Sequence, residues 1–196
     1  MALKFSKMPN NAIKALERGL KILPEKKHAR LLQLKKSDIH QNTPHKMYTL
    51  ELEDILSGEG LSRAKHVSWR YITEDSIVEV QRGENEGEFE FTEINQGMHV
   101  KDILEKLKIM EKHSKIKKGD YEVSMIMVPA LYVMALWLQD KEKKDDIIIP
   151  VGLVHPHLAK HPHTLFTPDE FIKTLKKAAE KRAAFDDSPV EESDCK

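Results

Sequence analysis

Short segments in which apolar and polar residues alternate run through the first half of the chain, and they predict β-strands. Residues 47–53 alternate cleanly, as expected of a strand with one solvent-exposed face. Residues 66–72 carry aromatic and apolar side chains at every second position. Residues 76–82 and 88–94 flank the glycine-bounded loop 83–87, an arrangement typical of a β-hairpin. Because the connections between these strands are short, we expect them to pair antiparallel.

Other segments repeat apolar residues every three or four positions, which indicates amphipathic α-helices. Residues 10–23, 99–113 and 167–185 are predicted to be helical. The apolar stripes are Ile13, Leu16, Leu20 and Leu23 in the first helix, Val100, Ile103, Leu104, Leu107 and Met110 in the second, and Phe171, Ile172, Leu175 and Ala179 in the third. At the start of the last helix, Thr167 and Glu170 have the spacing of a capping box.

The apolar run at residues 123–138 raises the question of a membrane span. A helix of this length would extend about 24 Å, which is short of a hydrocarbon core about 30 Å thick. Pro129 also divides the run. Before it, methionine alternates with a β-branched residue, as in a buried strand. We therefore predict a buried strand at residues 121–128 and a buried helix that begins near Pro129. A further strand is predicted at residues 147–151.

Together these elements predict an α+β fold. We expect a twisted, mainly antiparallel sheet of five or six strands, with three or four helices packed on one of its faces. The length of 196 residues suits a single core, so residues 1–185 are expected to form one domain. Residues 186–196 contain five acidic side chains and one large apolar side chain, and they are predicted to form a disordered acidic tail.

Charge and cysteine usage narrow the classes of function. Lys plus Arg and Asp plus Glu both number 32, so the net charge is zero and a general nucleic-acid-binding protein is not expected. The one cysteine, Cys195, has no partner for an internal disulfide, which fits a reducing compartment. The N-terminus lacks the apolar stretch of a secretory signal. We expect a cytoplasmic protein without a transmembrane segment.

The zero net charge conceals a basic N-terminal region. Residues 1–36 hold ten Lys or Arg against Glu17 and Glu25, so the predicted helix at residues 10–23 is basic on its polar side. Three uses fit such a helix. It can dock on the chain's own sheet, bind a protein partner or another acidic surface, or touch lipid or RNA.

The most chemically suggestive segment is residues 154–163, in which a His-Pro-His unit occurs twice. Its four imidazoles are His155, His157, His161 and His163. Neutral imidazole is a common ligand of Zn²⁺, Ni²⁺ and Cu²⁺. Because proline enforces extended backbone before it, His155 and His157 would project to the same side. The segment therefore predicts a transition-metal site, and the alternative is a proline-stiffened connector with exposed histidines.

Elsewhere the sequence shows no complete catalytic signature. It has no Gly-x-Ser-x-Gly motif, no phosphate-binding glycine loop and no dinucleotide fingerprint. His66 lies close to Ser62 and Ser68, but proximity along a chain says little about a catalytic triad. Two hypotheses follow. The favoured one is a non-catalytic interaction module (an adaptor, inhibitor, immunity or assembly protein) that binds a protein partner through its sheet surface or its basic N-terminal helix. The alternative is a transition-metal-binding protein, with a metal-dependent hydrolase as its catalytic form, built on the four histidines.

Overall fold

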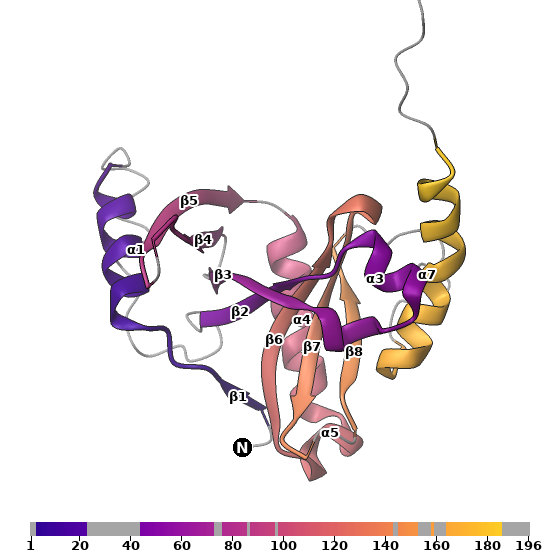
Figure 1. Cartoon of the computed structure of the whole chain (residues 1–196). Helices are drawn as coiled ribbons and strands as arrows, with labels where there is room; N and C mark the ends of the chain where they lie inside the picture. The colour runs from indigo at the N-terminus through magenta and orange to yellow at the C-terminus, as the bar shows by residue number, and fades with distance from the viewer. Residues whose placement is uncertain are drawn as a thin grey trace, which may run out of the picture.

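The structure of the protein is a computed structural model (Figure 1). It describes residues 3–22, 44–72, 76–85, 87–96, 98–142, 145–152, 158 and 164–185. The predicted acidic tail at residues 186–196 lies outside the described residues.

The described residues form one sheet of eight strands. The strands are β1 (Leu3–Phe5), β2 (Pro44–Thr49), β3 (Lys65–Ile72), β4 (Ser76–Arg82), β5 (Phe89–Gln96), β6 (Tyr121–Val128), β7 (Val133–Asp140) and β8 (Ile147–Val151). Their order is β5-β4-β3-β2-β6-β7-β8, and β1 pairs with β6 beside β2. The pairings of β1 and β2 with β6 are parallel, and the others are antiparallel. The sheet is therefore mainly antiparallel, as predicted.

The predicted numbers of strands and helices are wrong. Eight strands stand where five or six were expected, and the described residues include five α-helices rather than three or four. The helices are α1 (Asn10–Ile22), α3 (Leu52–Ser57), α4 (Met98–Lys112), α5 (Ser114–Lys118) and α7 (Pro168–Ala183). β1 and the short helices α3 and α5 escaped prediction because three to six residues are too few to show a period.

The largest error in the predicted order of elements is at Pro129. Residues Pro129–Leu131 form one turn of 3₁₀ helix, and Tyr132 then takes a left-handed φ of 53°. The chain reverses there, so that the predicted helix is strand β7, paired with β6 in unbroken register. Both faces of this hairpin are covered, and a strand buried on both faces is apolar throughout, which makes it hard to tell from a buried helix. Among the described residues, no helix is both long and apolar enough to cross a membrane.

Helices cover both faces of the β6–β7–β8 part of the sheet, not one face as predicted (Figure 1). On one face, α4 buries its whole predicted stripe, namely Val100, Ile103, Leu104, Leu107 and Met110. On the other face, α7 packs with its predicted apolar residues and begins with the predicted capping box of Thr167 and Glu170. Because successive strand residues point to opposite faces, Leu136 belongs to the first cluster and Trp137 to the second.

Helix α1 packs against β4 and β5, at the opposite edge of the sheet from β8 (Figure 1). Its buried side chains are Ala12, Ala15, Leu16 and Leu20. Ile13, which the predicted stripe included, is 37% exposed. The helix lies so close to β5 that a Cβ atom on Gly19 would come within 2.0 Å of Cγ of Phe91. Of the three uses expected for this helix, docking on the chain's own sheet is therefore what its apolar side does.

Candidate functional site

The four histidines predicted to bind a metal, His155, His157, His161 and His163, lie outside the described residues. Within the described part of the chain, no three His, Cys, Asp or Glu side chains are grouped as metal ligands would be. The transition-metal site at residues 154–163 therefore stays a prediction.

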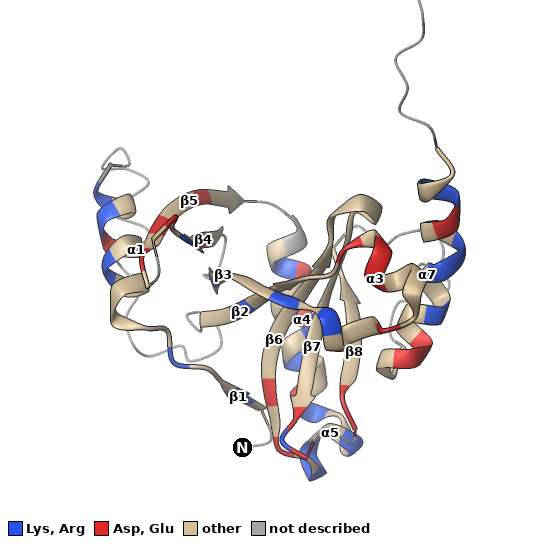
Figure 2. Ribbon diagram, in the orientation of Figure 1, with Lys and Arg blue, Asp and Glu red and all other residues tan. Residues whose placement is uncertain are grey.

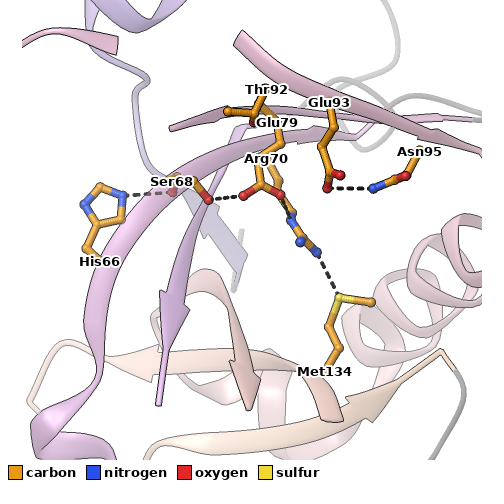
Figure 3. A network of polar contacts seen from close by, with 8 residues as sticks. All are labelled: His66, Ser68, Arg70, Glu79, Thr92, Glu93, Asn95 and Met134. Carbon is orange, nitrogen blue, oxygen red and sulfur yellow. Dashed lines mark hydrogen bonds and ion pairs between the residues drawn. The ribbon is translucent and has the colours of Figure 1, made fainter. Parts of the chain in front are cut away.

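The neighbouring His66 and Ser68 do not form a nucleophile and base. His66 Nε2 lies 3.0 Å from the backbone carbonyl oxygen of Ser68, while the Ser68 hydroxyl donates to Glu79 Oε1 at 2.6 Å (Figure 3). Burial, followed by the nearby Arg82 cation, lowers the pKa of His66. Ser68 is fully buried, so no substrate reaches its hydroxyl in this conformation. These contacts give Ser68 and His66 a structural role on β3.

The described residues enclose a cleft of about 800 Å³. It lies where β3, β4 and β5 meet the start of β7, the end of β8 and the first turns of α4. Its lining residues are Arg70, Ile77, Asn95, Asp102, Met127, Tyr132, Val133, Met134, Val151 and Gly152. Seven of these ten residues are apolar, aromatic or glycine, so the walls are largely non-polar and the few polar groups stand out.

One wall of the cleft carries a buried ion pair between neighbouring strands. Arg70 on β3 and Glu79 on β4 are opposite each other in the ladder, and Arg70 Nε donates to Glu79 Oε2 at 2.6 Å. Both side chains are more than nine-tenths buried. Figure 3 shows the guanidinium pointing across to β7, where Nη1 lies 3.0 Å from the sulfur of Met134. The Ser68 hydroxyl donates to the other oxygen of Glu79, so both carboxylate oxygens accept a hydrogen bond.

A second ion pair holds the opposite wall. Lys106 Nζ donates to Asp102 Oδ2 at 3.1 Å and to the Pro150 carbonyl oxygen at 2.7 Å. The backbone amide of Gly152 donates to the same Asp102 oxygen at 2.6 Å. These bonds tie the first turns of α4 to the end of β8, and they balance the negative charge of Asp102 from two sides. The wall is therefore held in place by bonds that need no ligand.

Tyr132 lies at the mouth of the cleft and is 90% exposed. Among the described residues it is the one non-glycine with a positive φ, a conformation that costs about 1 kcal/mol. The same residue borders a smaller hollow of about 420 Å³ on the α7 side. The β6–β7 turn thus holds an aromatic ring in water beside an apolar cleft, and strained, exposed positions of this kind are enriched at binding sites.

Sequence reasoning did not find this cleft. In the segment around β4, Glu79 stands between Val78 and Val80, and alternation shows that it faces away from them without showing what it faces. The available signal was the presence of Arg70 and Glu79 at central positions of two consecutive strands. A charged pair there indicates either a solvent-exposed face or a buried ion pair, and the strand pattern does not distinguish the two.

Comparison of the chain with protein-family models, with curated proteins and with solved structures found no match.

Proposed function

We propose that the protein is a non-catalytic binding module, and that its site is the cleft between β3–β5 and α4. The observation that carries the proposal is the cleft itself. Its volume of about 800 Å³ falls within the range of about 300–1,000 Å³ that is usual for sites of small organic ligands. An apolar lining with a few fixed polar groups is also the usual composition of such sites. The ligand that fits is a small amphipathic molecule.

The chemistry of the walls supports binding rather than catalysis. Glu79 and Asp102 each accept hydrogen bonds from a cation and from a further donor of the chain, so both already serve to hold the walls together. The Ser68 hydroxyl is buried behind Glu79. The described residues of the cleft therefore offer shape, apolar surface and hydrogen bonds.

The protein partner expected from the sequence remains part of the proposal, at a different surface. Lys14, Arg18 and Lys21 lie on the exposed side of α1, and Figure 2 shows Lys and Arg along that helix. Because the apolar side of α1 is already packed on the sheet, a partner would meet this helix through charge, and it would be acidic.

The cleft proposal is tested with 1-octanol and protein labelled with ¹³C at the methionine methyl groups. Two of the eight methionines, Met127 and Met134, line the cleft, whereas Met8 packs beneath α1. We expect the first two signals to shift on titration and the Met8 signal to stay unchanged. Met127→Trp should fill the cleft and abolish the shift of Met134. Ile109→Trp, at an α4 position that is 40% exposed and not among the lining residues, is the matched control and should leave the shift intact.

Two results would contradict the proposal. One is the absence of any shift at Met127 and Met134 up to the solubility limit of octanol. The other is an undiminished Met134 shift in the Met127→Trp protein, provided that both Trp variants melt cooperatively.

A further inference from the structure

We propose that the cleft selects ligands that carry a single carboxylate, and that Arg70 is the residue that recognises it. This inference rests on the proposed binding function and adds the chemical class of the ligand. It follows from an imbalance in the hydrogen bonding of one guanidinium group.

Arg70 has more N–H donors than the described residues provide with strong acceptors. A guanidinium presents five N–H donors in a planar fork. In the described part of the chain, its hydrogen-bonding partners are the Glu79 carboxylate at Nε and the Met134 sulfur at Nη1. A thioether sulfur is a weak acceptor. The Nη end of a charged group that is more than nine-tenths buried therefore faces the cleft with a poor partner.

A carboxylate matches this end of the side chain. The fork of a guanidinium bonds a carboxylate with two parallel N–H···O bonds, and such bonds are about twice as strong as neutral ones. Met134 is partly exposed, and methionine is unbranched and flexible, so its sulfur can move aside for an incoming oxygen. The apolar walls formed by side chains such as Ile77 and Val151 would then receive the hydrocarbon part of the ligand.

The charges around the cleft favour one negative charge over two, and an anion over a cation. Arg70 is the one cation among the described lining residues and is already paired with Glu79, so a second negative charge, as on a phosphate monoester, would be less well compensated than the first. A cationic ligand would be repelled by Arg70, and both carboxylates of the walls already have a cation of the chain beside them. Lys106 bonds Asp102 Oδ2, and Arg70 bonds Glu79, whose other oxygen accepts from Ser68.

The experiment compares octanoate, 1-octanol and octylamine at pH 7, with dissociation constants read from the methyl signals of Met127 and Met134. We expect octanoate to bind about 10- to 100-fold more tightly than octanol, the range for a hydrogen bond to a charged group. Arg70→Lys keeps the charge next to Glu79 but loses the fork, and it should reduce this advantage to roughly 3-fold or less.

Two further variants separate recognition from folding. Removing Arg70 alone leaves Glu79 as a buried unpaired charge, so the neutral test is the double variant Arg70→Gln with Glu79→Gln, in which the advantage of octanoate should vanish. Glu79→Gln alone removes the carboxylate at Nε and leaves the Nη end in place, so, provided that this variant still unfolds cooperatively, the advantage of octanoate should be kept or increased. A purely structural role for Arg70 would not make the preference vanish in the double variant and persist in Glu79→Gln.

The outcomes distinguish this inference from the function on which it rests. If octanol binds in the cleft as tightly as octanoate, the binding function stands and the carboxylate assignment fails. The assignment also fails if octylamine binds most tightly, or if the double variant keeps the preference for octanoate. If none of the three probes shifts the cleft methyl groups, the binding function fails as well.

Discussion

The stability of the protein should depend on pH through one buried histidine. His45 lies on β2, is fully buried, and packs edge-on against Phe5 with 5.2 Å between the ring centroids. Burial lowers its pKa from 6.5 to about 4, against a smaller opposing effect of a hydrogen bond with the backbone of Val123. The folded protein therefore binds this proton more weakly than the unfolded chain does. The stabilisation is complete above pH 6.5 and is lost as the pH falls towards 4.

The size of the effect follows from the two pKa values. With 6.5 in the unfolded chain and about 4 in the folded protein, the free energy of unfolding should fall by about 2 kcal/mol between pH 7 and pH 5, and by about 3 kcal/mol at pH 4. Glu122 and Asp120 have pKa values below their ordinary ones, so they titrate below this interval. The interval from pH 5 to pH 7 therefore reports mainly on histidine.

The assay is urea unfolding followed by tryptophan fluorescence at pH 7, 6 and 5, for the parent protein and for His45→Leu. The difference in slope between the two proteins isolates His45, because the other titrating groups are common to both. His66→Leu is the control at a half-buried histidine whose pKa is also lowered, and it should reduce the slope less. The reasoning is refuted if the unfolding free energy of His45→Leu falls between pH 7 and pH 5 as steeply as that of the parent.

Two further outcomes are expected. Leu136→Ala should lower the free energy of unfolding by about 2–5 kcal/mol, because Leu136 on β7 is fully buried in the cluster that includes α4. Ile109→Ala, at an exposed position, should change it by less than about 1 kcal/mol. Equal effects of the two variants in urea unfolding would disprove the described core. If residues 154–163 bind a transition metal, calorimetry on untagged protein should show stoichiometric Zn²⁺ binding that weakens below about pH 6.5. The binding should be lost when His155 and His157 are replaced together, and it should be kept when His28 is replaced. Undiminished binding in the double variant would reject this site.

Local patterns predicted the elements that are long enough for a repeat or a turn signal to be recognised. The hairpin of β4 and β5, the buried stripe of α4 and the capping box of α7 were all read correctly. In α4 and α7 one side of the helix meets water, so the change from apolar to polar residues marks its type and orientation, and the glycine-bounded loop 83–87 marks the hairpin. β7 was mistaken for a helix because this contrast is absent where α4 and α7 cover both faces of the hairpin.

By itself, the sequence determined the α+β class, the mainly antiparallel pairing and most of the residues that line the core. Only the tertiary structure decided that there is a cleft and which residues form its walls. Arg70 and Met134 are 64 positions apart, and Asp102 comes from a helix between them. Alternation states which side of a strand a residue occupies. It does not state which distant segment covers that side, because this depends on the order in which the strands pair across the whole sheet.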